Sequence, residues 1–551
     1  MTNRTLFKRR ILPLSVCAAL LLVCNFSARQ YFNDGHAQSV STARRQQQNQ
    51  ASPAARAEPT ASVSSAPTAG ELAREIDRTI DESEFARARW GIYVMSLRDG
   101  RVLYARNADR PLTPASNMKV YTTAVALDLL GAGYRWRTSV YAQKEPDKNG
   151  TVAGDLVLYG RGAPDLSSHS GKETNASLDQ LADELYRRGV RRVRGDVVGD
   201  ESYFKGEPLG DGWLWQDVQW YFGAEVSALS VNGNEIGIKI TPSSKTGEQA
   251  AVKFEQPTDY LHITNEANTV ERGHPASIGI TRGLSDNEVR IWGDFPAGGR
   301  VLQARLSVHK PALWAATLFR DALRARGINV EGQPRSVDAR TRKEDDRFNP
   351  QNSVELAALT GQTLGQIARA TNKESLNLNA ELILRTLGRE RGSMAPDPNP
   401  RRTERRGDDE AGVAVLRLWL SQHGIQTDAL SLHDGSGLSR LDLVTPEATA
   451  RLLAAITQTP SAGSFRDSLP VAGRDGTLAS RLRSVATAGR VLAKTGTLTY
   501  INSLSGYLTN SDGETLVFSI ICNDETEKAS STPVIDEIVT RLASVQSSPK
   551  S

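Results

Sequence analysis

Hydrophobic and polar positions in the first part of the chain repeat with two different periods. Apolar side chains recur at helical spacing from about Glu71, and two strand-like runs, WGIYVMSL and RVLYA, then flank Asp99-Gly100. An Asp-Gly pair between two strand-like runs is typical of a β-hairpin. Over residues 111–131 the apolar positions return to helical spacing and end at a glycine. We therefore expect a helix, a hairpin and a second helix, in this order.

A different pattern extends from about Arg135 to about Asn349. Short β-like runs alternate there with Gly/Asp turns, and Ala312–Gly327 is a helical stretch. We interpret residues 141–349 as a β-rich insertion of one or two subdomains. Helical periodicity returns after it in four stretches, at residues 354–370, 378–387, 411–423 and 446–457.

The chain ends in three strand-like runs, RVLAKTGTLTY, SLSGYLT and ETLVFSIIC, and in a helix that begins at Thr532-Pro533. Because strand-like runs also open the folded part, strands from both ends can share one antiparallel sheet with helices packed on it. The predicted fold class is therefore α+β. The predicted domains are a main domain at residues 71–140 and 350–545, the insertion at 141–349 and a tail at 546–551.

The first 70 residues do not continue these patterns. Lys8-Arg9-Arg10, the apolar run Ile11–Cys24 and Gly35-His36-Ala37 resemble a secretory signal peptide over residues 1–37. The apolar run is short for a membrane-spanning helix. We expect export to the periplasm or cell envelope. The alternative is that this N-terminal segment is retained as an anchor, which would be the only part of the chain in contact with a membrane. Residues 38–70 are rich in Ala, Ser, Gln, Pro and Arg and predict a disordered linker.

Charge and cysteine content exclude several kinds of partner and site. Residues 1–37 carry the whole formal net charge of +4, so the folded part has no basic excess for nucleic acid or an anionic membrane. Cys522 is the only cysteine outside the apolar N-terminal run, which excludes a disulfide framework and predicts a buried thiol. The sequence contains no H-E-x-x-H, C-x-x-C or P-loop motif, so we predict neither a metal site nor a cofactor.

Ser116 and Lys119 form an S-x-x-K motif at the start of the helix predicted over residues 111–131. Residues three apart lie on one helix face, so the amine is within reach of the hydroxyl. A serine hydroxyl becomes a strong nucleophile when a base removes its proton, and a desolvated lysine with a lowered pKa can be that base. The motif predicts a Ser/Lys nucleophile pair that needs no histidine.

Ser/Lys enzymes of acyl transfer also use a K-T-G motif, and this chain has two copies. The copy at residues 245–247 lies in a polar stretch between two strand-like runs, where these residue types are common in turns. The copy at residues 494–496 lies within a strand-like run, where its glycine permits close approach of a ligand to the backbone. We therefore favour the second copy.

A third motif, S-x-N, occurs three times. The copies that begin at Ser230 and Ser285 belong to the predicted insertion, and the latter lies in a turn-like stretch. Ser375 and Asn377 lie at a junction between two predicted helices after the insertion. We therefore favour the Ser375 copy.

With the three motifs in this order, the chain resembles the D-alanyl-D-alanine carboxypeptidases/endopeptidases of the low-molecular-mass class C penicillin-binding proteins, the peptidase S13 group. The resemblance covers about residues 71–545 and rests on PASNMK, GDLVLYGRGAPDL, GWLWQDVQWYFGAEVSALSVN, NKESLNLNAELILRTLG, LHDGSGLSR, LPVAGRDGTL and AKTGTLT. It implies a penicillin-binding/β-lactamase-like transpeptidase fold, an antiparallel sheet flanked by helices with large β-rich inserted subdomains. The separation of 259 residues between Ser116 and Ser375 agrees with such an insertion.

The resemblance implies a role for each catalytic residue. Ser116 would be the acylated nucleophile and Lys119 its base. Ser375 and Asn377 would relay a proton and contact the substrate amide, and Lys494 would add positive potential beside them. A second ammonium and a helix N-terminus both disfavour the charged form of Lys119, which a base at neutral pH requires.

The same resemblance implies the substrate contacts of the second K-T-G motif. Thr495 and Thr497, on either side of Gly496, would hold the terminal carboxylate of the substrate. The backbone N–H groups of Ser116 and Thr497 would form the oxyanion hole.

A side pocket for the diaminopimelate end of a peptidoglycan stem peptide is also implied. Its residues would be Asp217, Phe222, Arg440 and Thr499, with Asp217 and Arg440 pairing with the amino and carboxylate groups. The group has a longer amide side chain where this chain has Thr499. The alternatives are an exposed loop carboxylate for Asp217 and a solvated or structural arginine for Arg440.

His433 precedes Asp434 and Ser436, which raises the alternative of a Ser-His-Asp hydrolase. No G-x-S-x-G elbow is present, and side chains of adjacent residues point apart. Both observations disfavour that alternative.

We interpret Trp213 and Trp215 as packing residues rather than substrate contacts. The arginine-rich stretch Arg389–Arg406 is most simply a solvated loop, with contact to wall polymers or lipid as the alternative.

Together these features predict an exported serine-type D-Ala-D-Ala carboxypeptidase that also has D,D-endopeptidase activity. Its partners would be peptidoglycan stem peptides and the β-lactams that acylate it, with no nucleic acid, metal or cofactor. The alternatives are a β-lactamase, which needs a dedicated deacylating base, and a non-catalytic wall-binding or scaffolding protein, which has no need of five intact catalytic residues.

Overall fold

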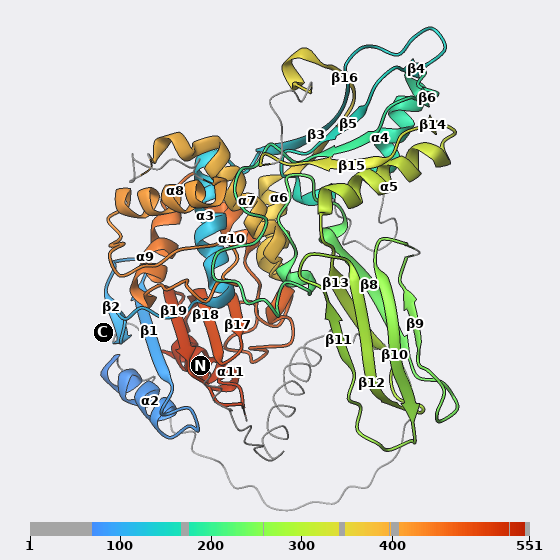
Figure 1. Cartoon of the computed structure of the whole chain (residues 1–551). Coiled ribbons are helices and arrows are strands. Elements are labelled where there is room, and N and C mark those ends of the chain that lie inside the picture. Colours follow the sequence, from blue (N-terminus) through green and yellow to red (C-terminus); the bar gives the residue numbers. More distant parts are fainter. Residues whose placement is uncertain are drawn as a thin grey trace, which may run out of the picture. The chain divides into compact units, whose positions relative to one another are not determined.

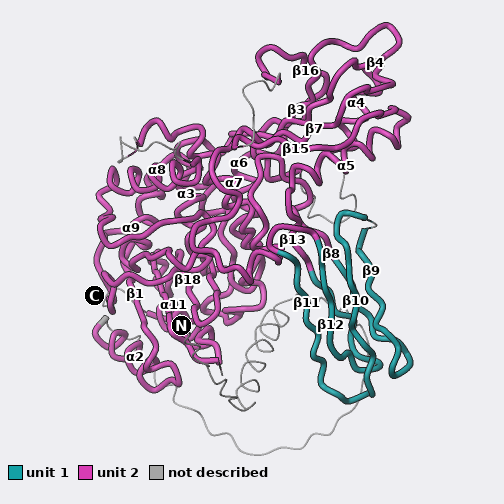
Figure 2. The backbone as a smooth tube through the Cα atoms, in the orientation of Figure 1, with its two compact units in different colours: residues 1–63, 238–283, 288–304 teal, residues 64–237, 284–287, 305–551 magenta. Residues whose placement is uncertain are grey.

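The computed structural model describes residues 69–166, 176–256, 258–340, 348–395, 397, 407–527 and 529–545. The predicted signal peptide, all but the last two residues of the predicted linker, the predicted tail and part of the Arg389–Arg406 stretch lie outside the described residues. The chain divides into two compact units (Figure 2). One contains residues 238–283 and 288–304, and the other contains the rest of the described chain.

A five-stranded antiparallel sheet in the larger unit joins strands from both ends of the described chain (Figure 1). β1 and β2 form the hairpin predicted around Asp99-Gly100, and β19 pairs with β1 so that Cys522 lies opposite Trp90. The predicted shared sheet is confirmed, and the Cys522 thiol is buried as expected. In sheet order the strands are β17 (Val491–Leu498), β18 (Ile501–Thr509), β19 (Thr515–Asn523), β1 (Arg89–Ser96) and β2 (Val102–Arg106).

Successive side chains of a strand point to opposite faces of its sheet. Apolar side chains lie on both faces of this sheet, so both faces are buried. Tyr507 and Ile521 belong to one apolar cluster together with α3 and α9, whereas Leu504 and Phe518 belong to another with α2 and α11. The layers are thus helix, sheet and helix, which confirms the α+β prediction. The four helices are α2 (Ala69–Asp81), α3 (Met118–Leu130), α9 (Pro446–Ile456) and α11 (Thr532–Ser544).

Helix α3 is buried along most of its length, from Met118 to Leu127. It packs against α6, α7, α8, α9 and α10, so side chains near its first turn are held by several helices at once. This setting matters because the S-x-x-K motif lies there. The further helices are α6 (Leu364–Glu374), α7 (Asn377–Arg391), α8 (Asp408–Gln422) and α10 (Ala462–Ser468).

A second five-stranded sheet of the larger unit corrects one prediction. Residues 354–363 were expected to be helical but form β16 (Val354–Thr363), which pairs antiparallel with β3 (Arg135–Ala142). A short apolar run does not distinguish helix from strand, and here pairing with a distant strand decides. The sheet runs β15 (Pro334–Val337), β7 (Val197–Asp200), β5 (Leu156–Tyr159), β3 and β16; helices α4 (Ala176–Arg187) and α5 (Pro311–Ala325) and the short strands β4 (Thr151–Val152), β6 (Arg192–Val193) and β14 (Asn329–Val330) accompany it.

The smaller unit is built from strands, which agrees with the β-rich pattern of its sequence. Two three-stranded sheets have the orders β10-β12-β11 and β13-β8-β9. The strands are β8 (Glu235–Thr241), β9 (Ala251–Phe254), β10 (His262–Val270), β11 (Gly279–Arg282), β12 (Glu288–Pro296) and β13 (Leu302–Ser307). The first residues of β8, up to Gly237, and the last residues of β13, from Arg305, belong to the larger unit.

No helix in the described ranges is both long enough and apolar enough to cross a membrane.

Candidate active site

Ser116 lies in a single 3₁₀ turn, Ala115–Asn117, that leads directly into α3. Lys119 follows in the first turn of α3, and its Nζ donates a hydrogen bond of 2.8 Å to Ser116 Oγ. The pair predicted from the three-residue spacing is therefore formed. Ala115 has φ +48, a conformation that costs a non-glycine residue about 1 kcal/mol and that surrounding contacts must maintain.

Lys119 is completely buried. Besides Ser116, its Nζ contacts Asn377 Oδ1 at 2.6 Å and the backbone oxygen of Ser436 at 2.7 Å. A neutral amine can donate to these two oxygens and keep its lone pair directed at the Ser116 hydroxyl. The geometry therefore suits a general base.

Burial lowers the pKa of Lys119 to about 7, while the nearby carboxyl groups of Asp434 and Glu381 act in the opposite direction. The lowered pKa agrees with the expectation for a base, but its main cause is burial rather than the neighbouring ammonium. Sequence reasoning missed the two acids. Glu381 had a signal, because it is a charged residue in the apolar stretch NLNAELILRTLG, one helical turn after Asn377.

Ser375 lies between α6 and α7, as predicted, and has a left-handed backbone with φ +58. Its Oγ accepts a hydrogen bond of 2.9 Å from Lys494 Nζ. Asn377 is the first residue of α7, and its Nδ2 donates to the backbone oxygen of Phe222 at 2.8 Å. The favoured S-x-N copy thus joins both lysines.

The other motif copies lie elsewhere. Lys245 and its neighbours form an exposed turn between β8 and β9, and Ser285 lies in a bend between β11 and β12. Ser230 is buried, and its Oγ bonds to Ser227 and Asn234. The turns predicted for the 245–247 and 285–287 copies are therefore present.

Lys494 lies on β17 and is completely buried. Its Nζ also donates to the backbone oxygen of Thr495 at 2.7 Å. Burial first, and the charge of Lys119 second, hold the pKa of Lys494 well below its usual range. The site therefore resists holding a proton on both lysines at once.

The K-T-G strand lies against the turn that carries the nucleophile. A Cβ on Gly496 would lie 2.2 Å from Ser503 Oγ and 2.7 Å from the backbone oxygen of Pro114. The protein's own turn thus already requires a glycine at this position, and the close approach of a ligand to its backbone stays a prediction. Thr495 Oγ1 donates to Thr477 Oγ1 at 2.8 Å, and Thr497, which is exposed, donates to Asn502 Oδ1 at 3.0 Å.

The sequence matches the family described as "D-Ala-D-Ala carboxypeptidase 3 (S13) family" over residues 72–545. The chain belongs to this S13 family. It is 35% identical to the D-alanyl-D-alanine carboxypeptidase of Actinomadura sp. (strain R39) over 486 residues, which cover 86% of this chain and 84% of that protein. It is 24% identical to D-alanyl-D-alanine carboxypeptidase DacB of Haemophilus influenzae, with 78% of this chain and 84% of that protein covered.

Solved structures support the fold of this S13 chain. Penicillin binding protein 4 (dacB) from Haemophilus influenzae has a TM-score of 0.72 at 22% identity, covering 85% of this chain and 99% of that one. The same protein complexed with a novel β-lactam has a TM-score of 0.67 at 21% identity, with coverage of 85% and 98%. The predicted penicillin-binding fold is confirmed.

Contacts connect three of the four residues predicted for the side pocket with each other or with the site. Arg440 Nη1 donates to the backbone oxygen of Thr499 at 3.2 Å, so these two are brought together. The carbonyl of Phe222 contacts Asn377. Asp217 is 2% exposed, so the alternative of an exposed loop carboxylate is wrong.

The two tryptophans before Asp217 differ from each other. Trp213 is half-buried and its Nε1 donates to Asp434 Oδ2 at 2.9 Å, in line with a packing residue. Trp215 is 70% exposed, so the prediction that it packs is wrong.

The histidine alternative is also resolved by contacts. The ring of His433 bonds to Ser431 Oγ and to Asp211 Oδ2, each at 2.9 Å. Ser436 Oγ instead donates to the carboxylate of Asp434. His433 therefore points away from Asp434 and Ser436, as predicted, whereas Asp434 and Ser436 contact each other and form no triad with the histidine.

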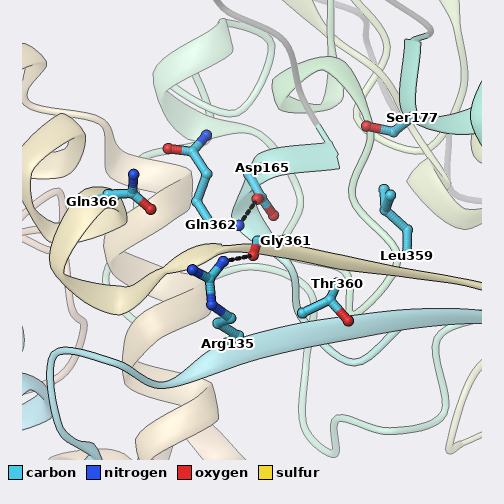
Figure 3. A pocket seen from close by; sticks show the side chains of 8 residues that line it. All are labelled: Arg135, Asp165, Ser177, Leu359, Thr360, Gly361, Gln362 and Gln366. Carbon is cyan, nitrogen blue, oxygen red and sulfur yellow. Dashed lines mark hydrogen bonds between the residues drawn. The ribbon is translucent and has the colours of Figure 1, made fainter.

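Apart from this site, the larger unit has a shallow hollow of about 400 Å³ (Figure 3). It lies where β16 meets the start of α6, and Arg135 donates there to the backbone oxygen of Gly361 at 2.6 Å. Helix α6 has 11 residues, so its far end at Ser375 is roughly 16 Å away. None of the lining residues belongs to the lysine site. In the described part of the chain, no group of three or more His, Cys, Asp or Glu side chains is arranged to hold a metal ion.

Proposed function

We propose that this chain is a serine-type D-Ala-D-Ala carboxypeptidase that acts on peptidoglycan stem peptides through an acyl-enzyme on Ser116. The observation that carries the proposal is the 2.8 Å hydrogen bond between Ser116 Oγ and the buried Lys119 amine. Burial lowers the pKa of that amine to about 7, so a large fraction is neutral at physiological pH. Membership of the S13 family supports the same activity.

In the acylation step Ser116 Oγ attacks the carbonyl carbon of the penultimate D-Ala, and its proton passes to Lys119 Nζ. The backbone N–H groups of Ser116 and Thr497 stabilise the resulting oxyanion. The C–N bond to the terminal D-Ala then breaks as Ser375, beside Lys494, gives its proton to the leaving amine, and the proton that Lys119 took from Ser116 passes on to Ser375. Water finally hydrolyses the ester, which releases the shortened peptide and restores the Ser116 hydroxyl.

Substrate recognition divides between two groups of residues. Thr495, Gly496 and Thr497 hold the terminal carboxylate, with Lys494 adding positive potential. The side pocket accepts the diaminopimelate end of the stem peptide, which also permits D,D-endopeptidase cleavage of D-Ala-diaminopimelate cross-links. The pocket residues are Asp217, Phe222, Arg440 and Thr499.

The remaining parts of the chain fit an enzyme of the cell wall. We propose that residues 1–37 direct export to the periplasm or cell envelope, that residues 38–70 form a linker, and that the peptidase domain comprises 71–140 and 350–545 around the insertion at 141–349. β-Lactams would acylate Ser116, since penicillin binding protein 4 (dacB) from Haemophilus influenzae, which has a similar fold, was solved in complex with a β-lactam.

Covalent labelling with a fluorescent penicillin tests the proposal. We expect persistent label on the wild-type chain, none on Ser116→Ala, and release of D-Ala from a stem pentapeptide by the wild type alone. Label that disappears within minutes would indicate a β-lactamase instead. A folded wild-type chain that takes no label would leave the non-catalytic wall-binding protein as the better description.

A further inference from the structure

Residues 433–442, HDGSGLSRLD, form a loop that touches the Ser/Lys pair. The backbone oxygen of Ser436 accepts from Lys119 Nζ at 2.7 Å. Gly437 has φ +79, and a Cβ there would lie 1.8 Å from the backbone oxygen of Ala115, the residue before the nucleophile. A shift of this loop would therefore displace both the base and the turn that carries Ser116.

The Asp434 carboxylate holds the loop together from inside. It is 1% exposed and accepts five hydrogen bonds. Oδ1 accepts from the backbone N–H groups of Ser436 (3.1 Å) and Gly437 (2.6 Å). Oδ2 accepts from Ser439 N–H (2.8 Å), Ser436 Oγ (3.1 Å) and Trp213 Nε1 (2.9 Å). Both oxygens act only as acceptors in these bonds, as an ionised carboxylate does.

Two further acids lie beside Asp434. Glu381 is 1% exposed and its Oε1 accepts from Gly435 N–H at 3.0 Å. Asp442 is completely buried; its Oδ1 accepts from His433 N–H at 2.7 Å, and no donor among the described residues reaches its Oδ2. Three carboxyl groups in one buried place do not all ionise, because desolvation and mutual repulsion oppose it.

The charge distribution follows from these contacts. Burial first, and the negative charge of Asp434 second, raise the pKa of Glu381 to about 8. The same two causes hold the pKa of Asp442 well above its usual range. Asp442 is then a neutral acid whose hydroxyl donates to Asp434, which accounts for the oxygen without a donor. Arg385 faces Glu381 one helical turn away on α7. The main negative charge beside Lys119 is therefore that of Asp434.

We propose that Asp434 is a positioning residue for the Ser/Lys pair: its carboxylate fixes the 433–442 loop and supplies the counter-charge for Lys119 when that amine takes the Ser116 proton. Glu381 and Asp442 support it as protonated acids. This proposal rests on the proposed function, because it assumes that Lys119 is the base.

The geometry gives Asp434 two separable effects. The first is structural, since an asparagine would present an N–H₂ group to backbone N–H donors and so weaken the hold on the Ser436 carbonyl. The second is electrostatic, since Asp434 is the larger of the two acidic contributions that oppose the lowering of the Lys119 pKa. The titratable and charged groups around the pair are Asp434, Glu381, Lys494, Asp442, Arg385 and, on the outer side of the loop, His433 with Asp211.

The test is the rate of acylation by a fluorescent penicillin as a function of pH, on the full chain. Acylation of the wild type should fall below pH 7 as Lys119 gains a proton. We call this decrease on the acidic side of the pH–rate profile the acidic limb. In Asp434→Asn we expect the maximal rate to fall about 10- to 100-fold. We also expect the acidic limb to move to lower pH by about half a unit or more, because the amine loses its nearby negative charge. A structural defect alone would lower the rate without moving the limb.

Two companion variants separate charge from shape. Asp434→Glu keeps the charge, so its acidic limb should stay at the wild-type pH while its maximal rate falls. This variant still tests the proposal if Asp434→Asn does not fold. Asp442→Asn replaces one neutral donor by another, so its limb should also stay in place. The matched control is Asp211→Asn, an isosteric change at a 72% exposed side chain near the loop, with wild-type rate and limb.

Several results would overturn the proposal. The charge distribution would be contradicted if the acidic limb of Asp434→Asn stays at the wild-type pH. It would also be contradicted if the limb of Asp434→Glu moves, or if that of Asp442→Asn moves to lower pH. If the wild type itself takes no label, the proposed function fails instead. The two failures are therefore distinguishable.

Discussion

Replacing Lys119 by methionine should abolish acylation and remove a pH dependence from the stability of the protein. The pKa of Lys119 is about 7 in the folded chain against 10.5 for an ordinary lysine. The unfolded chain therefore binds more protons than the folded chain between these two values, and stability rises with pH there. The destabilisation is fully present below pH 7 and is lost as the pH rises to 10.5.

The magnitude follows from the two pKa values. At pH 7 the cost of burying this amine is about 4 kcal/mol, and at pH 9 it has fallen to about 2 kcal/mol. The wild type should thus gain about 2 kcal/mol relative to Lys119→Met over this interval. Spread over a unit of some 400 residues, this corresponds to a relative rise in Tm of roughly 2 °C.

Differential scanning calorimetry at pH 7 and pH 9 measures this change. Ser116→Ala is the matched control, since it removes the nucleophile but keeps the buried amine and should follow the wild type. An equal change of Tm in the wild type and in Lys119→Met between the two pH values would refute the claim that burial sets the pKa of Lys119. This holds even if the methionine variant is inactive.

Three further changes test other parts of the structure. Gly437→Ala should lower acylation at least about tenfold, because its Cβ needs both a positive φ and a place 1.8 Å from a backbone oxygen; an unchanged penicillin labelling rate would contradict the tight contact. Arg440→Ala should raise KM for a diaminopimelate-containing stem peptide at least about tenfold and change labelling by a small β-lactam less than about threefold; equal losses for both would place Arg440 outside the side pocket. Trp215→Ala should change the free energy of unfolding by less than about 0.5 kcal/mol, whereas Trp213→Ala should cost more than about 1 kcal/mol; chemical denaturation of the two variants compares them.

Local sequence patterns predicted much of the fold and the central pair. The Ser116–Lys119 contact depends on helical spacing alone, and the hairpin around Asp99-Gly100 depends on a turn signal between two strands. Strand β16 was missed because its short apolar run fits both a helix and a strand. Its pairing with β3, more than 200 residues earlier in the chain, decides between them.

The environment of the pair could not be predicted in the same way. Asp434 is an ordinary residue in sequence, and Glu381 stands out only as a charge within an apolar stretch. The importance of both comes from burial beside Lys119 after distant segments have packed together. The same holds for Gly496, whose neighbours at Pro114 and Ser503 come from opposite ends of the chain. Trp215 illustrates the opposite error, since a large aromatic residue was assigned to the core and is exposed.

The arrangement of charges explains why this site needs so large a scaffold. Two buried lysines and three buried carboxyl groups are each costly to desolvate, and the cost is offset only where every charge has partners. The partners of Lys119 come from the 3₁₀ turn before α3, from α7 and from the 433–442 loop. With protons on Glu381 and Asp442, the single carboxylate of Asp434 balances the proton that Lys119 takes from Ser116. That balance lets a lysine with a pKa near 7 accept the Ser116 proton without leaving an unpaired charge in the interior.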